Sequence, residues 1–261
     1  MCGRFSLTAT PEEVREFLAL LELEDFPARY NIAPTQPILA VIAGEQGAPG
    51  SNLPQRRALL IRWGLTPGWV KDPRDFPLLV NARAETAAEK ASFRAAMGHR
   101  RILIPASGFY EWRRPPKESG QKSQAFWVRP RHGRIVAFAG LMETWASADG
   151  SEVDTGAILT AAANPAFARI HDRMPVVIAP EDFDRWLDCK NQEPRHVANL
   201  LRSPPEDLFE AIPVSDLVNK VANVGPEVQA PVDPSVVVEK PKPKAAKPKA
   251  DGGGGGQMSL F

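Results

Sequence analysis

Cysteine is scarce in this chain, since Cys2 and Cys189 are the only two among 261 residues. Two thiols so far apart in sequence do not form the framework of a disulfide-rich domain. The sequence also has no secretory leader and no apolar run long enough to span a bilayer. These absences favour a cytoplasmic protein with reduced thiols and no membrane partner. We expect Cys189, near Trp186 and Leu187, to be a buried structural thiol.

An excess of charge is lacking too, because 32 lysines and arginines balance 31 acidic residues. This balance excludes a uniformly basic surface, so any binding of DNA must depend on local placement of arginines. The histidines have no ligand spacing with each other or with a cysteine, and no glycine-rich phosphate loop is present. We therefore expect neither a metal nor a cofactor.

Helix signals are few. Thr10-Pro11-Glu12-Glu13 has the pattern of a capping box with proline in the first turn. The apolar residues that follow at helical spacing, which we expect to form one buried face, are Val14, Phe17, Leu18 and Leu21. A second helix is expected over 86–97, with Gly98 as its C-terminal stop. Short helices are expected at 165–170, 181–187 and 196–202.

Strand signals dominate the rest of the chain. The expected strands are 38–43, 58–63, 102–104, 126–128, 135–138, 157–161 and 176–178, with a loop over 44–52. Because these strands follow one another through short connections, we predict the α+β class, built mainly on antiparallel sheet with flanking short helices.

The composition changes near residue 223. Residues 226–250 are rich in Pro, Lys, Ala and Val without periodicity, and 252–256 are five glycines. Such composition is typical of disordered segments. We expect one domain over 1–222, a disordered linker over 223–256 and a short binding peptide over 257–261.

The residue that follows Met1 has unusual reactivity. Methionine aminopeptidase removes Met1 when the next residue is small, so the mature chain is expected to begin at Cys2. An N-terminal cysteine carries an α-amine and a thiol on one residue, and this pair condenses with aldehydes to form a thiazolidine.

Three further stretches place polar groups beside apolar segments, where sites often form. They are VNARAET at 80–86, IPASGFYEW at 104–112 and HDRMP at 171–175. Each also has an ordinary interpretation: Asn81 caps a turn, Glu111 is the exposed residue of an alternating strand, and His171 forms a surface pair with Asp172.

The chain resembles the SRAP family, the SOS-response-associated peptidase-like proteins that process abasic sites in DNA. The resemblance runs from Cys2 to about Pro213, through MCGRF, YNIAPTQ, RWGLTPGW, NARAET, PASGFYEW, FAGLMET, TAAAN and HDRMPV in order. It implies a barrel-like fold. Two positions depart from the family pattern: Arg101 stands where many relatives have cysteine, and Met142 stands where tryptophan is common.

The resemblance also implies site residues and roles. The Cys2 amine attacks the aldehyde of an opened abasic sugar, and the Cys2 thiol closes the thiazolidine. Glu111 shuttles protons, His171 assists ring opening, and Asn81 orients the amine and the lesion. These roles suit a carboxylate, an imidazole and an amide. The expected activity is covalent capture of abasic sites in single-stranded DNA by a monomer, with accompanying AP lyase activity.

DNA contacts are expected beside these residues. Arginine forks suit phosphate oxygens, and aromatic rings stack on unpaired bases. The candidate phosphate ligands are Arg4, Arg83 and Arg173, for which ordinary ion pairing is the alternative. The candidate wedge or stacking platform is Trp63, Pro67 and Trp69, for which a place in the core is the alternative.

Two other functional classes remain open at this point. The first is a cysteine peptidase with an N-terminal nucleophile, which would use Cys2, Glu111 and His171. The second is a noncovalent reader of damaged DNA. Replacing Cys2 with alanine separates them, because only the noncovalent reader keeps its full function.

The last residues resemble the peptide by which bacterial proteins dock on the DNA polymerase sliding clamp. The matching residues are Gln257, Met258, Leu260 and Phe261. The preceding linker would span ~30 Å as a flexible coil, which would leave the domain free to search nearby DNA.

Deleting residues 257–261 is expected to abolish binding to the sliding clamp, because the two hydrophobic anchors are lost. Surface plasmon resonance against immobilised clamp measures this loss. Crosslinking to abasic DNA in solution should remain intact in the same variant, which serves as the folding control. Clamp binding that persists after the deletion would contradict the prediction.

Overall fold

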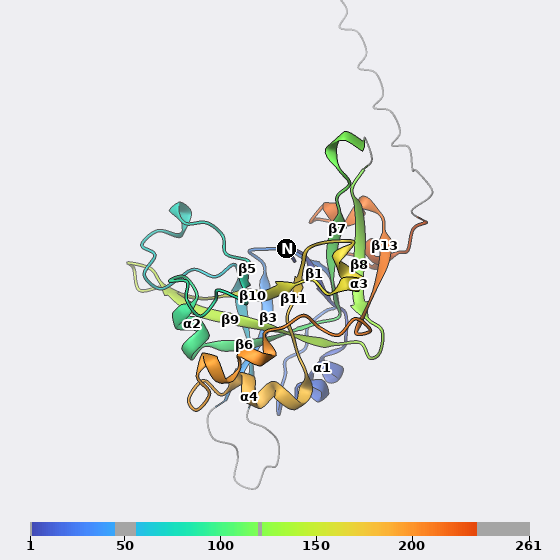
Figure 1. The fold of residues 1–261 in the computed structure, drawn as a ribbon. Coiled ribbons are helices and arrows are strands. Elements are labelled where there is room, and N and C mark those ends of the chain that lie inside the picture. The colour runs from blue at the N-terminus through green and yellow to red at the C-terminus, as the bar shows by residue number, and fades with distance from the viewer. Residues whose placement is uncertain (1, 45–55, 120–121, 234–261) are drawn as a thin grey trace, which may run out of the picture.

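The computed structural model describes residues 2–44, 56–119 and 122–233, and sheet dominates it (Figure 1). The predicted class is confirmed. The strands are β1 Phe5–Leu7, β2 Arg29–Ile32, β3 Pro37–Ala43, β4 Arg56–Trp63, β5 Asn81–Arg83, β6 Arg101–Ala106, β7 Gly108–Arg113, β8 Gln124–Pro130, β9 Val136–Ala146, β10 Glu152–Ala162, β11 Arg173–Pro175, β12 Val177–Ile178 and β13 Phe209–Val214. The α-helices are α1 Pro11–Phe17, α2 Arg94–His99, α3 Pro165–Ala168 and α4 Phe183–Leu187.

Short 3-10 helices complete the list of elements. They are η1 Pro73–Asp75, η2 Lys117–Ser119, η3 Pro180–Asp182, η4 Pro194–His196, η5 Ala198–Leu200, η6 Asp216–Asn219 and η7 Pro226–Gln229. Every predicted strand overlaps an observed one. The helix expected at 196–202 is replaced by η4 and η5.

The larger sheet closes on itself like a barrel. Its order is β11-β10-β4-β3-β6-β9-β12, and an additional pairing joins β10 to β9, so that β10, β4, β3, β6 and β9 form a ring. Most pairings are antiparallel, as predicted, but β10 runs parallel to β4 and to β5. Through β10, the sheet therefore brings β5 and β11 together.

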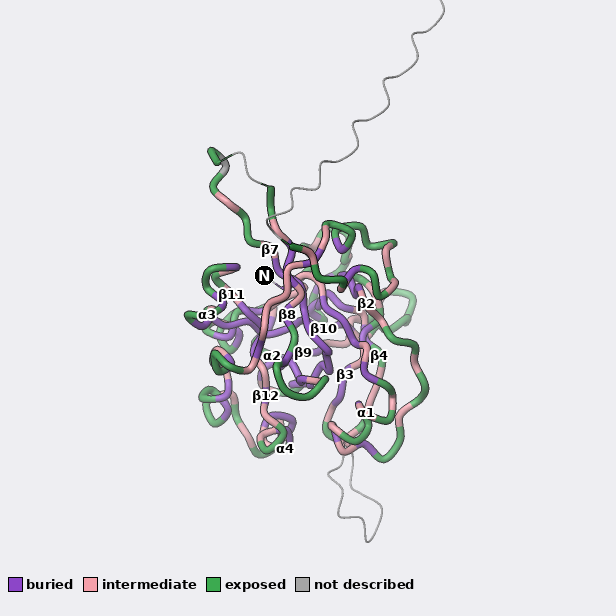
Figure 2. Tube along the Cα trace, turned by 90° about the vertical axis from the view of Figure 1, so that its right-hand side faces the viewer, coloured by how far each residue is buried: buried purple, intermediate pink, exposed green. Residues whose placement is uncertain are grey.

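The smaller sheet holds the beginning of the chain. Its order is β13-β8-β7-β1-β2, with Phe5 of β1 opposite Phe109 of β7 and Ile32 of β2. Phe5 is buried and packs edge-on against Trp63 and Phe138, with ring centroids 5.1 and 6.3 Å away. These contacts join the two sheets in one core, which Figure 2 shows as the buried interior.

The first helix has the predicted start but a shorter extent. Thr10 Oγ1 accepts from the Glu13 amide at 3.2 Å, and Glu13 Oε2 accepts from the Thr10 amide at 2.8 Å, which completes the capping box. Val14 and Leu18 are buried. The prediction that Leu21 is buried is wrong: the helix ends at Phe17, and Leu21 is 49% exposed.

The helix predicted over 86–97 is also wrong for most of its length. Residues 86–93 form turns, and α2 covers Arg94–His99, so that Gly98 lies within the helix. Both Ala87 and Phe93 are buried. A continuous helix would turn these two side chains ~120° apart, whereas successive turns allow both to reach the core.

Arg101 organises the helices around the barrel. Its side chain is buried and donates to the carbonyls of Met97, Trp186, Asp188 and Gln192 at 2.6–3.0 Å. Its backbone amide donates to Cys189 Sγ at 3.4 Å. Cys189 is only partly buried, contrary to the prediction, because α4 ends at Leu187 and places Cys189 in the following turn.

Packed structure continues past the predicted domain boundary at 222. Val228 of η7 is fully buried, and Pro231 forms a β-bridge with Val214. The linker prediction is therefore wrong for 223–233. Val228 packs into the domain, and the composition of the segment does not reveal this contact. The rest of the predicted linker, the peptide 257–261 and most of the predicted loop 44–52 lie outside the described residues. Within the described ranges, no helix is long and apolar enough to cross a membrane.

Gly108, at the start of β7, is expected to tolerate no side chain. Its φ is +155°, and a Cβ there would lie 2.5 Å from the carbonyl oxygen of Val128. Because the obstacle is backbone, we expect Gly108→Ala to lower the free energy of unfolding by at least ~2 kcal/mol. Denaturant titration measures the change.

Gly98→Ala is the matched control for that measurement. A Cβ at Gly98 would meet nothing within 4 Å, and the residue lies inside α2. We expect this variant to be neutral or more stable by up to ~1 kcal/mol. Equal effects of the two substitutions would contradict the steric argument.

Candidate active site

Cys2 is held in place although it is near the start of the chain. Its side chain is fully buried, and its carbonyl oxygen accepts a hydrogen bond from Asn81 Nδ2 at 2.8 Å. The Tyr110 amide donates to the Arg4 carbonyl at 2.9 Å, which extends the β1–β7 pairing towards Cys2. Asn81 lies on β5 of the larger sheet, so the contact with Cys2 links the two sheets at the site.

The Cys2 thiol is kept in its neutral form. Burial raises its pKa well above the ordinary value, and the nearby negative charge of Glu111 raises it further. The thiol also lies 3.8 Å from the carbonyl of Arg4, which can accept its proton in a hydrogen bond. A neutral thiol is a weak nucleophile, so chemistry that begins at Cys2 is favoured to begin at nitrogen.

Glu111 is buried, which contradicts its interpretation as an exposed strand residue. It lies on β7, and its side chain is 3% exposed. Because the first four residues of β7 are all buried, both faces of that part of the strand are covered, and alternation along the strand does not predict exposure. Its Oε2 accepts from the Trp112 amide at 3.4 Å. A carboxylate beside the first residues is well placed for proton transfer.

His171 lies in the short connection between α3 and β11. Its Nδ1 lies 3.0 Å from both the Arg173 amide and Asp172 Oδ1. Nδ1 also lies 3.2 Å from the Arg173 carbonyl. With the ring proton on Nε2, Nδ1 accepts from the Arg173 amide; with a proton on Nδ1, that atom donates to the Arg173 carbonyl or to Asp172. β11 and β5 both pair with β10, which brings the segment of His171 into the same sheet as Asn81.

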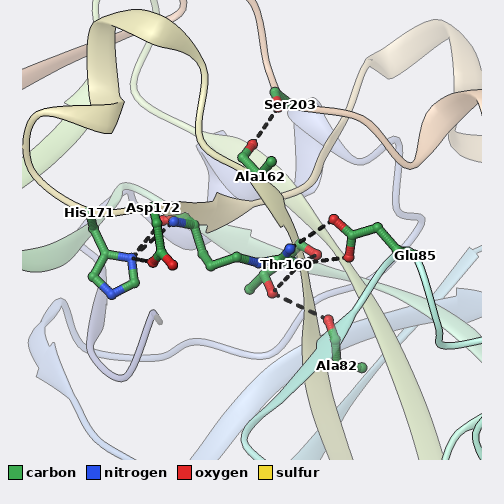
Figure 3. A network of polar contacts seen from close by, with 8 residues as sticks. Ala82, Glu85, Thr160, Ala162, His171, Asp172 and Ser203 are labelled. Atoms are coloured by element: carbon green, nitrogen blue, oxygen red, sulfur yellow. Dashed lines mark hydrogen bonds and ion pairs between the residues drawn. The ribbon is translucent and has the colours of Figure 1, made fainter.

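Arg173 is bound to the carboxylate of Glu85, which Figure 3 shows close to Thr160. Its Nη1 and Nη2 donate to the two oxygens of Glu85 at 2.8 and 2.9 Å, and Nη2 also contacts the Thr160 carbonyl. The Arg173 side chain is 13% exposed. These contacts match the alternative interpretation, ordinary ion pairing, and hold the backbone that orients His171.

The other predicted phosphate ligands differ from each other. Arg4 Nη1 donates to Asn31 Oδ1 at 2.8 Å and to the Val218 carbonyl at 2.7 Å, and the residue is half-buried. Arg83, at the end of β5, is exposed, and the described contacts include no ion pair for it. Arg83 is thus the most accessible cation close to Asn81.

The predicted aromatic platform is only partly accessible. Trp63 is fully buried and its Nε1 donates to the Val80 carbonyl at 2.9 Å, while Pro67 is also buried. Their burial contradicts the wedge or stacking role and favours the core interpretation. Trp69 is 60% exposed and meets Phe76 edge-on at 5.4 Å, so it alone of the three offers an accessible ring.

Sequence reasoning missed two residues that support the site. The first is Asn31, which is buried, accepts a hydrogen bond from Arg4 and donates to the carbonyls of Val218, Lys220 and Asn223. The second is Glu85, which forms the ion pair with Arg173. These two residues lie in the YNIAPTQ and NARAET stretches, and their place in those motifs was the signal by which the sequence could have pointed to them. In the described part of the chain, no three His, Cys, Asp or Glu side chains gather as metal ligands would.

Glu85→Gln is expected to lower the free energy of unfolding at neutral pH by ~1 kcal/mol or less, and the thermal midpoint with it. The effect is small because half of the Glu85 side chain is exposed, so that solvent screens the ion pair. The hydrogen bonds from Arg173 lower the pKa of Glu85. Stability from this pair is therefore present above the ordinary glutamate pKa and is lost as pH falls through the lower folded value.

The difference in midpoint between wild type and Glu85→Gln should consequently shrink below pH ~4. Calorimetry at a series of pH values measures it. Glu89→Gln, at an exposed position on the adjacent turn, is the control. A difference that stays constant down to acid pH would contradict the argument.

Comparisons with known proteins find relatives that are named for the processing of abasic sites. The abasic site processing protein YoqW of Bacillus subtilis (strain 168) is 37% identical over 231 residues, which cover 87% of this chain and 98% of that protein. The abasic site processing protein YedK of Escherichia coli (strain K12) is 32% identical over 240 residues, which cover 89% and 100%.

A crystal structure of a protein from Bacteroides thetaiotaomicron has the same fold. Its TM-score is 0.73 at 23% identity, over 88% of this chain and 100% of that one. The family described as SOS response associated peptidase (SRAP) matches residues 1–221. The ordered motifs and these matches agree, and the chain belongs to the SRAP family.

Proposed function

We propose that this protein processes abasic sites in DNA, and that it captures them covalently through Cys2 when they lie in single-stranded DNA. The names of its relatives support the first part. The observation that carries the second is the setting of Cys2: a buried residue whose carbonyl is fixed by Asn81, with the Glu111 carboxylate close enough to raise the pKa of its thiol.

The proposed reaction starts after removal of Met1. The free α-amine of Cys2 adds to the C1′ aldehyde of the opened sugar and expels water, which leaves a C=N bond. The thiol sulfur then adds to the same carbon, and the thiol proton passes to the nitrogen. One water is lost overall, and both nucleophiles come from one residue.

The neutral thiol fits this order of events. An amine is the stronger nucleophile when the thiolate is scarce, and the protonated sulfur brings the hydrogen that the ring nitrogen requires. The cysteine peptidase alternative would use the same thiol, with the α-amine of Cys2 as its base, and is separated from covalent capture by experiment. The neutrality of the thiol does not by itself exclude the noncovalent reader.

The surrounding groups take complementary roles in the proposal. Glu111 accepts the ammonium proton of Cys2 and returns it during loss of water, and Asn81 orients the first residue. The His171 imidazole donates a proton to the sugar ring oxygen as the ring opens. Reaction through a C=N bond also allows β-elimination, so we propose weak lyase activity.

DNA is proposed to reach Cys2 past exposed groups. Arg83 is exposed next to Asn81 and has no ion pair within the described residues, and Trp69 offers an accessible ring for an unpaired base. Binding of the sliding clamp by residues 257–261 remains a separate proposal, tested by the deletion described above.

Intact mass spectrometry tests the covalent step. Wild-type protein mixed with an oligonucleotide that carries one abasic site is expected to give a species equal to both masses less one water. Cys2→Ala should give no stable adduct. Cys2→Ser keeps the amine but not the thiol, so its adduct should be observed only after borohydride reduction.

A chain with an uncleaved N-terminal extension completes the set of controls. It keeps the thiol of Cys2 but not the free amine, and it should form no adduct. A wild-type sample that lacks Met1 and still forms no adduct would overturn covalent capture. An adduct in the extended chain would show that sulfur reacts first.

A further inference from the structure

A polar cavity lies at the far end of β1 from Cys2. It measures about 450 Å³, and its lining includes Ser107, which precedes β7, Trp127 of β8 and Arg131, which follows β8. We call it the β8 cavity. Cys2 precedes β1 and Thr8, another lining residue, follows it, so the cavity is separate from the site at Cys2. Its volume suits a ligand of nucleotide size.

The charge of the β8 cavity is positive. Its lining contains three arginines and one glutamate. Arg129 uses Nε to bind Glu210 at 2.6 Å, and Arg134 binds Glu13 at 2.7 Å. Arg131 donates through Nε to the Phe209 carbonyl at 3.1 Å, and the described residues provide no acid within ion-pair distance of it. The guanidinium end of Arg131 is therefore the cation available to a ligand.

Two further hydrogen-bond donors belong to residues that line the cavity. Trp127 Nε1 is buried and has no acceptor among the described residues. Its position is tightly fixed, because a Cβ on Gly108 would lie 2.7 Å from it and the Arg129 guanidinium lies 5.2 Å from its ring centroid.

Ser107 adds a further donor. Its Oγ accepts from the amides of Thr8 and Ala9 at 3.0 and 3.2 Å, which leaves its hydroxyl hydrogen to donate. A guanidinium, an indole N–H and a hydroxyl form a set of donors. The complement of such a set is a ligand with several acceptor oxygens and negative charge.

We propose that the β8 cavity binds a phosphate group of the DNA strand that extends from the lesion. The extended run from Cys2 to Thr8 covers ~20 Å. That length corresponds to roughly six nucleotides at the per-strand spacing of duplex DNA, and to fewer in an extended single strand. The inference rests on DNA being the substrate, but not on covalent capture at Cys2.

Arg131→Gln removes the available cation of the β8 cavity. Fluorescence anisotropy with an unmodified 20-nucleotide single strand is expected to show several-fold weaker binding, and a plot of log K against log salt should lose about 0.7 of its slope. Arg195→Gln is the matched control, because Arg195 is exposed on η4 and does not line the cavity. Equal binding by these two variants would overturn the inference.

Trp127→Phe tests the cavity without a change of charge. It removes the unpartnered N–H but keeps an aromatic ring, and binding of the 20-mer should again weaken. An unmodified dinucleotide, too short to span the ~20 Å from Cys2 to the cavity even when it is extended, should bind all variants equally. Thermal midpoints confirm that each variant is folded, and equal weakening of both strand lengths would overturn the reach argument.

Inorganic phosphate separates the two sources of the ligand. Phosphate added at constant ionic strength should compete with the 20-mer on wild type and not on Arg131→Gln. If phosphate raises the thermal midpoint in an Arg131-dependent way while the 20-mer binds both proteins equally, free phosphate is the ligand and the DNA assignment is overturned. Because unmodified DNA is used, failure of crosslinking at Cys2 leaves this test intact.

Discussion

The structure depends on one constraint, which is the place of β1 inside a sheet. Chain ends usually fray, but β1 pairs with β7 on one edge and β2 on the other. The Tyr110–Arg4 backbone bond continues that pairing, and Asn81 then fixes the carbonyl of Cys2. A reactive residue at a frayed end would sample many positions. Here the backbone of its neighbours determines where its nitrogen and sulfur lie.

The same constraint explains why the site draws on both sheets. Glu111 comes from β7 of the smaller sheet, whereas Asn81 belongs to β5 of the larger one and His171 lies just before β11. The edge-on packing of Phe5 against Trp63 fixes the two sheets relative to each other. A variant of Trp63 would therefore disturb the site through the core, so its loss of activity would not identify a DNA contact.

The sequence predicted features whose cause is local. The capping box at Thr10, the strand segments and the ordered motifs all depend on neighbouring residues, and the fold class follows from them. Exposure was harder to predict. Alternation along a strand suggests that Glu111 faces solvent, but β7 is covered by partners distant in sequence. Arg101 is a similar case, since its four carbonyl partners come from segments that only the fold brings together.

The roles of the arginines could not be predicted from sequence either, because ion pairs formed in the fold decide which of their charges remain available at the site. From sequence, Arg4, Arg83 and Arg173 look equivalent, but Glu85 already neutralises Arg173 in a bidentate pair. A DNA phosphate would have to displace that carboxylate and would leave Glu85 unpaired close to a polyanion. Arg173 is therefore better understood as a positioning residue, whose anchored side chain holds the amide that orients His171. Arg83, exposed beside Asn81, keeps its charge available, so a chain with almost no net charge can still attract DNA at this point.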